Sequence, residues 1–148
     1  MSKKNAIVFS IALLIVFLDQ LTKILIKKNF QLSESIPIIK NILHLTYVTN
    51  TGSAFGLFKG LNLFFMLFSV IVTVVIFYYL KKKIKENEIL LQLAVGLLLG
   101  GTLGNFIDRL AYGHVTDFID FRVWPVFNIA DSAVTISVVL LIVLLWRK

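Results

Sequence analysis

The chain has 148 residues, of which 58% are hydrophobic and 16% are charged, with a mean hydropathy of +0.90 and a net charge of +7. In soluble domains about half the residues are apolar and about a quarter are charged, so this composition excludes an ordinary soluble domain and indicates a lipid environment. Cysteine is absent and there are two histidines, which excludes disulfides, thiolate metal sites and a cysteine nucleophile and argues against a histidine-rich metal site.

Four apolar runs are long enough to cross a bilayer, which takes roughly 20 residues. They comprise residues 6–26, 61–80, 89–106 and 127–145. Few residues remain, so we predict a single polytopic membrane domain over residues 1–148, all-α, with four transmembrane helices. The first run lacks a small-x-small cleavage site and contains Asp19 and Lys23, so we interpret it as a retained span and not as a signal peptide.

The positive charge follows the ends of these runs, which indicates topology and argues against nucleic-acid binding. Three short segments at helix ends hold eight of the fifteen basic residues, namely Lys3, Lys4, Lys81, Lys82, Lys83, Lys85, Arg147 and Lys148. The two longer connections, 28–60 and 108–126, hold five. The positive-inside rule therefore predicts that both termini are cytoplasmic and that the longer connections face outward.

The first outer connection is expected to form a small β-rich unit, because residues 35–40 and 44–49 have alternating or β-branched character. The second contains residues 115–121 and then Trp124 and Pro125, which predicts an interfacial segment with aromatic side chains at headgroup depth. Residues 50–58 contain two glycines, which suggest turns. Asn50 is interpreted either as part of its own turn or as a contact for a peptide substrate, and the turn is favoured.

Polar side chains inside membrane spans usually face the bundle interior, so we treat them as candidate functional residues. Asp19 and Lys23 are four residues apart on one helical face, which favours a structural ion pair or a snorkelling lysine over direct catalysis. The third span repeats glycine at positions 96, 100 and 104, a pattern typical of close helix packing.

A second face of the third span carries Gly101, Asn105 and Asp108, followed by Arg109. We expect this face to present a small residue, an amide and a charge pair to a common cavity. An Asp108–Arg109 structural network and a ligand site are equally compatible with the pattern. Arg109, with five donors, is the better candidate to contact a substrate.

The fourth span begins with a polar stripe on an otherwise apolar helix, formed by Asn128, Asp131, Ser132 and Thr135. A buried Asp131 needs a partner or a proton, and the nearest acids along the chain are Asp117 and Asp120. Two carboxylates in one site share a proton, as aspartic peptidases require. Proton or ion translocation uses intramembrane acids as well, so both functions stay open on this evidence.

Two other hydrolytic arrangements have little support. A serine–lysine dyad would have to combine Lys23 with Ser53 or Ser132, and no spacing recommends it. A Ser-His-Asp set would need His44 or His114, which are expected in loops.

Five segments together resemble the lipoprotein signal peptidase family, also called signal peptidase II. The matching segments are Asp19-Gln-Leu-Thr-Lys23, Asn50-Thr-Gly-Ser-Ala-Phe-Gly56, Gly100-Gly-Thr-Leu-Gly-Asn-Phe-Ile-Asp-Arg109, Gly113-His-Val-Thr-Asp-Phe118 and Phe127-Asn-Ile-Ala-Asp-Ser132. They occur in the family's order over nearly the whole chain. Ser53 stands where the family more often has alanine, a small change that we expect to be tolerated.

The resemblance implies an aspartic endopeptidase with Asp117 and Asp131 as its catalytic dyad and Asp120 as a bystander. It further implies a substrate pocket and supporting residues. The pocket residues are Asn50, Gly101, Asn105, Arg109, Asn128 and Ala130, and the supporting residues are Asp19 and Lys23.

The substrate implied by the resemblance is a prolipoprotein whose cysteine already carries a diacylglyceryl group, cut just before that cysteine. The implied location is the bacterial cytoplasmic membrane, with the active site at its outer face and in contact with membrane lipid. No metal, organic cofactor or nucleic acid is implied, and a monomer suffices.

Overall fold

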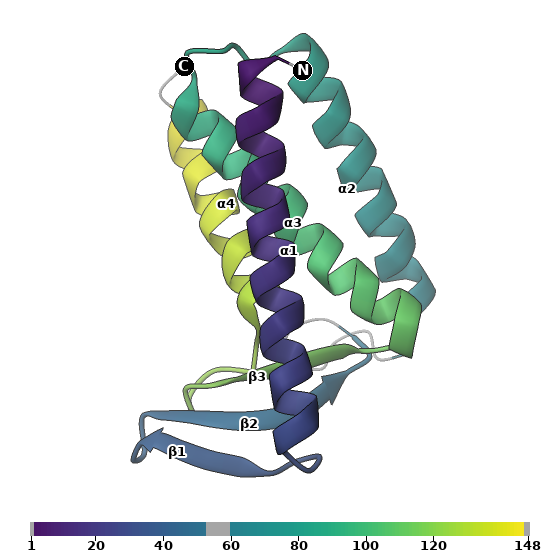
Figure 1. Cartoon of the computed structure of the whole chain (residues 1–148), viewed down its shortest axis with the longest axis vertical. Coiled ribbons are helices and arrows are strands. Elements are labelled where there is room, and N and C mark those ends of the chain that lie inside the picture. Colours follow the sequence, from purple (N-terminus) through teal and green to yellow (C-terminus); the bar gives the residue numbers. More distant parts are fainter. Residues whose placement is uncertain (1, 53–59, 147–148) are drawn as a thin grey trace.

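The four helices of the described residues stand side by side, and a small sheet lies at one end of them (Figure 1). The computed structural model describes residues 2–52 and 60–146. The elements in chain order are α1 Lys3–Asn29, β1 Ser35–Ile39, β2 Leu43–Asn50, α2 Asn62–Lys82, α3 Ile89–Tyr112, β3 Val115–Asp120 and α4 Ile129–Trp146. The start of α1, the α2–α3 connection and the end of α4 all lie at the end opposite the sheet (Figure 1).

Three helices, α1, α2 and α3, are long and apolar enough to cross a membrane, as predicted. The apolar stretch of α4, Ile129–Leu144, is shorter. Large apolar side chains point outward along the helices, for example Leu13, which is 71% exposed, and Leu63, which is 67% exposed. Contiguous exposed apolar surface of this kind needs a lipid or protein partner.

The helices differ from the predicted spans chiefly at their ends. α1 continues through Lys4 and Lys27, and α3 runs six residues past the predicted end at residue 106, to Tyr112. Backbone hydrogen bonding does not stop where apolar residues stop, so a hydropathy pattern underestimates the helix. α3 ends at Gly113, which adopts φ +74 and donates its N–H to Arg109 O, a common helix termination.

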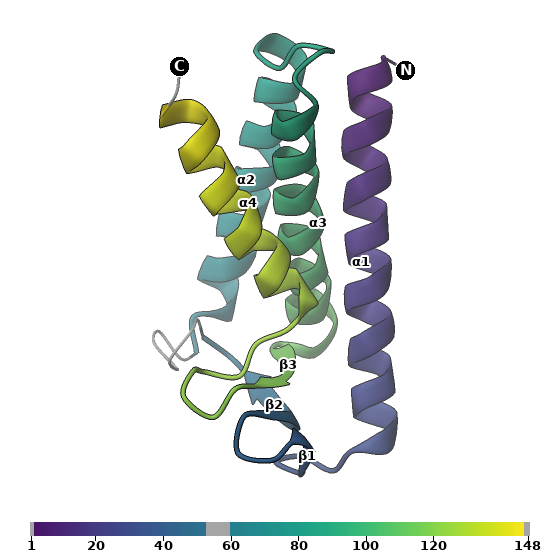
Figure 2. The ribbon, with the colours of Figure 1, turned by 90° about the vertical axis from the view of Figure 1, so that its left-hand side faces the viewer.

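α3 is the central helix, because α1, α2 and α4 each pack against it. Figure 2 shows α1 and α3 side by side along their length. A methyl group at Gly96 would lie 2.8 Å from Ile11 Cβ, and one at Gly100 would lie 2.8 Å from Ala12 O. The predicted packing role of this glycine row is therefore confirmed, since only hydrogen fits between the two helices.

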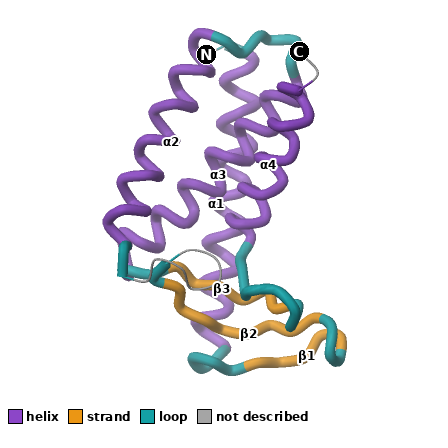
Figure 3. The backbone as a smooth tube through the Cα atoms, turned by 180° about the vertical axis from the view of Figure 1, so that it is seen from behind, coloured by secondary structure: helices purple, strands orange, loops and turns teal. Residues whose placement is uncertain are grey.

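The sheet has three antiparallel strands in the order β1-β2-β3 (Figure 3). The hairpin of β1 and β2 matches the predicted β-rich connection. Residues Val115–Asp120 form the strand β3, with Val48 opposite Asp117, a strand that was not predicted from the sequence, and the interfacial depth of this segment stays a prediction. Its Phe118 is buried, whereas Trp124 after the strand is exposed. A short polar–apolar run gave no indication of this long-range strand partner.

We predict that Gly100→Ala destabilises the protein by about 1–3 kcal/mol, the usual cost of overpacking. The added methyl group would meet the α1 backbone at Ala12, which cannot move aside without separating α1 from α3. Thermal unfolding in detergent micelles measures the effect. Leu13→Ala, on the exposed face of α1, is the control. Equal melting temperatures for Gly100→Ala and the parent would contradict the packing role.

Candidate active site

The chain returns on itself between β3 and α4, and this return brings two acids together. Phe127 forms an isolated bridge with Ile119, and its carbonyl accepts the N–H groups of both Phe118 and Ile119. α4 begins two residues later, at Ile129. The antiparallel return therefore places the first turn of α4, with Asp131, next to the middle of β3, with Asp117.

The first turn of α4 is held by side chains that satisfy its free N–H groups. Asn128 Oδ1 accepts the N–H of Asp131 at 2.8 Å, and Asp131 Oδ2 accepts the N–H of Asn128 at 3.3 Å. This reciprocal pair is a capping box, which fixes the rotamer of the acid as well as the helix start. From α1, Asp19 Oδ1 accepts the N–H of Ala130 at 3.0 Å.

Three asparagine amides join the two acids. Asn128 Nδ2 donates to Asp117 Oδ1 at 2.6 Å, and Asn50 Nδ2 donates to Asp117 Oδ2 at 3.0 Å. Asn105 Nδ2 donates to Asp131 Oδ1 at 2.7 Å. Asn128 contacts both acids, so Asp117 and Asp131 belong to one hydrogen-bond network.

Asp117 lies in β3, outside the helices, and its side chain is almost inaccessible, with 2% exposed. Burial, and then repulsion by the nearby charge of Asp131, raise the pKa of Asp117 to about 7, although donors from Asn50 and Asn128 oppose the shift. A carboxyl group with a pKa near neutrality can hold a proton and give it up under ordinary conditions.

A buried charge cluster supports the pair from the side of α1. Lys23 Nζ lies 2.8 Å from Asp19 Oδ2 and 3.3 Å from Asp108 Oδ2, and all three side chains are inaccessible. The expected Asp19–Lys23 ion pair is present. The Asp108–Arg109 pair is not formed: Asp108 pairs with Lys23, and Arg109 instead donates to Gly52 O at 3.1 Å.

Sequence reasoning assigned no role to two residues that complete this cluster. Gln20 Nε2 donates to Asp19, to Gly104 O and to Asp108 Oδ1, at 3.1–3.2 Å. The backbone N–H of Thr116 donates to Asp108 Oδ2 at 2.9 Å. Spacing gives no signal for either contact, because each depends on a neighbouring element and not on the residue's own helix or strand.

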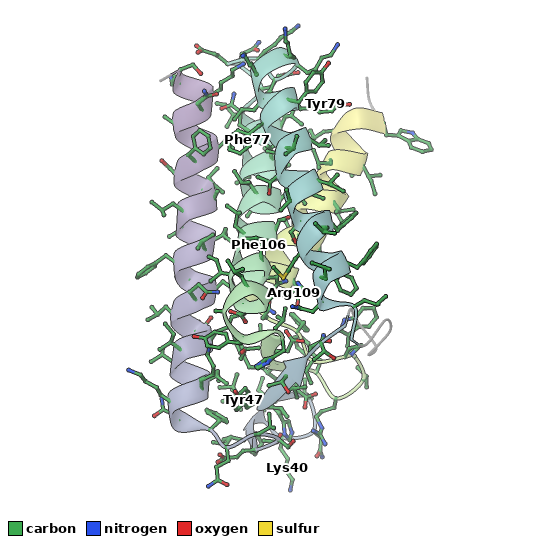
Figure 4. The ribbon with its side chains drawn as sticks, turned by 90° about the vertical axis from the view of Figure 1, so that its right-hand side faces the viewer. Lys40, Tyr47, Phe77, Tyr79, Phe106 and Arg109 are labelled. Atoms are coloured by element: carbon green, nitrogen blue, oxygen red, sulfur yellow. The ribbon has the colours of Figure 1, made fainter. Side chains whose placement is uncertain are left out.

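A cavity of about 490 Å³ opens beside the two acids. Its polar wall includes Asn50, Asn105, Arg109, Asp117 and Asp131, and its apolar wall includes Val115, Trp124, Pro125, Val126, Phe127, Val134 and Ile136. Figure 4 shows Arg109 near the end of α3 that faces the sheet. The Arg109 guanidinium lies 4.9 Å from the centre of the Phe65 ring, a cation–π contact beside the cavity.

Three of the predicted pocket residues, Gly101, Asn128 and Ala130, do not line this cavity. A methyl group at Gly101 would lie 2.5 Å from Ala130 O, so these two residues form the close contact between α3 and α4. Asn128 is fully buried behind the acids. Direct contact of these three residues with a substrate stays a prediction.

Asp120 occupies a separate environment. Its carboxylate accepts from Thr46 Oγ1 at 2.8 Å and pairs with Arg122 at 3.0 Å. Burial raises the pKa of Asp120, but these hydrogen bonds and the Arg122 charge outweigh burial and hold it below its usual value. Asp120 therefore closes the β3–α4 return and does not line the cavity.

His44 and Ser53, considered for other hydrolytic arrangements, lie outside the network of the two acids or outside the described residues. His44 Nδ1 lies 3.2 Å from Ser35 Oγ in the hairpin. His44 is not among the residues that hydrogen-bond to Asp117 or Asp131 in the described part of the chain. Ser53 and residues 53–59 of the glycine-containing connection lie outside the described residues. Within residues 2–52 and 60–146, no three acidic or histidine side chains form a metal-binding group.

We predict that Asn128→Ala destabilises the protein by about 1–3 kcal/mol, the cost of leaving buried groups unpaired. The change removes the α4 cap and the 2.6 Å donor of Asp117. Ser132→Ala is the matched control, because Ser132 Oγ donates only to the carbonyl of Asn128 four residues earlier. Thermal unfolding with equal effects of both variants would contradict the central role of Asn128.

Comparisons with known proteins agree on one family. The family model described as signal peptidase (SPase) II matches residues 11–147. Lipoprotein signal peptidase of Halothermothrix orenii is 45% identical over 142 residues, covering 95% of this chain and 96% of the relative. That of Moorella thermoacetica is 46% identical, covering 88% of this chain and 87% of the relative.

Two solved structures, both described as bacterial membrane enzymes, have the same fold. One superposes with a TM-score of 0.90 at 38% identity, covering 95% of this chain and 87% of that structure. The other has a TM-score of 0.87 at 37% identity, covering 95% and 93%. The apolar helices and these neighbours identify a multi-pass membrane protein with peptidase relatives. The chain belongs to the signal peptidase II family.

Proposed function

We propose that the protein is an aspartic endopeptidase that removes signal peptides from diacylglyceryl-modified prolipoproteins, with Asp117 and Asp131 as its catalytic pair. The observation that carries the proposal is the sharing of Asn128 by the two acids, at 2.6 Å from Asp117 and through the capping box with Asp131, beside one cavity. Membership in a peptidase family supports hydrolysis as the reaction class.

The chemistry needs one acid ionised and the other protonated. The ionised carboxylate takes a proton from water as the water oxygen attacks the scissile carbonyl carbon. The protonated acid donates to the carbonyl oxygen, and protons then return as the C–N bond breaks and the amine leaves. Two acids in one buried site adopt this singly protonated state because a second negative charge is costly there. The mechanism uses no metal or organic cofactor.

The two walls of the cavity suit a lipidated peptide. Polar groups of Asn50 and Arg109 lie beside the acids and can hydrogen-bond a peptide backbone. The apolar wall from Trp124 to Phe127 suits acyl chains. We propose that the scissile bond precedes the lipidated cysteine, whose acyl chains extend along the helices into lipid. The relatives' name, lipoprotein signal peptidase, agrees with this substrate.

We further propose that the whole chain is one membrane domain with α4 as a fourth span. In this proposal both termini lie in the cytoplasm of a bacterial cell, and the sheet and acids lie at the outer face of its cytoplasmic membrane. The lysine-rich helix ends, at the end opposite the sheet, support this orientation. The acids lie near the sheet end, where a hydrolytic site can obtain water. Both acids and the asparagines that hydrogen-bond to them belong to one chain, so a monomer is sufficient.

A small ion- or proton-translocating protein is the alternative that uses the same acids. Such a function favours acids near the middle of the bilayer and a continuous polar path. In this chain the acids lie at the first turn of α4 and in β3, at one end of the helices. The alternative would gain support if the purified protein conducted protons in liposomes and failed to cleave a lipidated precursor.

We predict that Asp117→Asn and Asp131→Asn each reduce cleavage of a diacylglyceryl prolipoprotein by about 100-fold or more, since each removes a proton-transfer group. The assay follows release of the signal peptide by the purified protein in detergent micelles. Asp120→Asn is the matched control and should retain cleavage, because Asp120 binds Thr46 and Arg122 outside the cavity.

Two results would contradict the proposed pair. Undiminished cleavage by either Asp117→Asn or Asp131→Asn would mean that the acids are wrongly assigned. Cleavage of an unmodified precursor at the same rate would remove the requirement for the diacylglyceryl group.

We predict that kcat/KM falls as the pH rises above about 7. Burial and the charge of Asp131 raise the pKa of Asp117 to about 7, so the singly protonated pair loses its proton through this range. Above it, the rate should decrease about tenfold for each pH unit, as expected for one lost proton. Initial rates at low substrate over a pH series measure the profile, and a flat or rising profile above neutrality would contradict the shared proton.

A further inference from the structure

The catalytic chemistry leaves open which acid is ionised, and a buried lysine distinguishes them. Lys23 Nζ has three polar neighbours: Asp19 at 2.8 Å, Asp108 at 3.3 Å and Asn105 Oδ1 at 3.0 Å. An ion pair needs only the first two. The third contact connects the ammonium group of α1 to the amide that reaches Asp131.

The ammonium group fixes the orientation of the Asn105 amide. An ammonium group has donors and no acceptor, so the oxygen of Asn105 must face it and the NH₂ group must point away. Asn128 Nδ2 donates to the same oxygen at 3.2 Å, which favours the same orientation. The NH₂ group of Asn105 then donates to Asp131 Oδ1 at 2.7 Å. The NH₂ group of Asn105 can only donate, so it needs an acceptor on Asp131. An ionised carboxylate offers both of its oxygens as acceptors.

Asp131 also lies where negative charge is favoured. It occupies the first turn of α4, near the positive end of the helix, and its second oxygen accepts the N–H of Asn128 at 3.3 Å. Asp117 lies in a strand and not at a helix start. Its two oxygens accept from the neutral amides of Asn50 and Asn128.

Further charged groups surround the pair. α1 contributes Asp19 and Lys23, α3 contributes Asp108 and Arg109, and β2 contributes only the neutral Asn50 within the described residues. Arg109 lines the same cavity as Asp117 and Asp131. Burial and the nearby charge of Asp131 raise the pKa of Asp117 to about 7.

We propose that Lys23 is a positioning residue that, through Asn105, makes Asp131 the ionised member of the pair and leaves the proton on Asp117. The proposal rests on the proposed peptidase function. Asp131 takes a proton from water while the water oxygen bonds to the carbonyl carbon, and Asp117 gives its proton to the carbonyl oxygen. As the C–N bond breaks, Asp131 gives its proton to the leaving amine and Asp117 recovers one from the tetrahedral diol. Both acids return to their starting states.

The test replaces the lysine without leaving an extra buried charge. Lys23→Met combined with Asp108→Asn removes one positive and one negative charge, and Asp108→Asn alone is the matched control. The chain has five aspartates, so carboxyl-¹³C aspartate labelling gives few signals, which single Asp→Asn variants assign. Titration of these signals by NMR in micelles reports the proton on each acid without any need for turnover.

In the parent and in Asp108→Asn, we expect the Asp117 signal to titrate near pH 7, with the Asp131 signal already that of a carboxylate at mildly acidic pH. In the double variant the Asp131 titration should move upward by about one pH unit, the scale of a lost nearby charge. The acidic limb of the kcat/KM profile should move with it. A purely structural lysine would lower the rate at every pH and leave the limb in place.

The proposal is overturned if Asp117 carries the carboxylate signal in the parent, or if the double variant titrates as the control does. If the double variant does not fold, Asn105→Ala breaks the same connection while Lys23 keeps its two carboxylates, and the same upward movement is expected. Failure of the peptidase function would appear separately, as undiminished cleavage by Asp117→Asn or Asp131→Asn. If both acids are essential and Asp131 does not move, only the role of Lys23 is refuted.

Discussion

Close contact of α1 and α4 with the glycine faces of α3 is the constraint on which the site depends. At Gly104 a methyl group would lie 2.6 Å from Asp19 Oδ2, and at Gly101 it would lie 2.5 Å from Ala130 O. These approaches allow a carboxylate on α1 to reach past α3 and accept the N–H of Ala130 at the start of α4. A larger residue at either position would separate the helices that carry Lys23 and Asp131. The packing of the helices and the hydrogen-bond geometry of the site therefore depend on the same glycine contacts.

The low polarity of the surroundings explains why the polar groups form a continuous network. Buried charges in such an environment must be paired and hydrogen-bonded. Here Lys23 pairs with both Asp19 and Asp108, and Gln20 donates to the same two carboxylates. Asn105 and Asn128 extend the network to Asp131 and Asp117. Amides suit this position because each offers a donor and an acceptor without adding charge. The network can thus hold two acids close together and leave them one proton.

The cavity lies at the boundary between this polar network and an apolar surface. One wall carries the acids, Asn50 and Arg109, and the opposite wall carries aromatic and aliphatic side chains of the β3–α4 return and of α4. A substrate that combines a peptide with acyl chains would meet a suitable surface for each part. This division follows from the fold, since the sheet, the last turns of α3 and the start of α4 supply polar groups while the helix sides are apolar.

The sequence by itself determined the apolar helices, the helix-packing glycine row, the β1–β2 hairpin and the candidate acids, because each has a local periodicity or an unusual polar residue in an apolar run. The family resemblance selected Asp117 and not Asp120 as the partner of Asp131, a choice that residue spacing left open. Tertiary structure alone decided that residues 115–120 pair with β2, that Asp108 pairs with Lys23 and not with Arg109, and that Gly101 and Ala130 pack together behind the cavity. These features depend on contacts between residues far apart in the chain, which a local pattern does not encode.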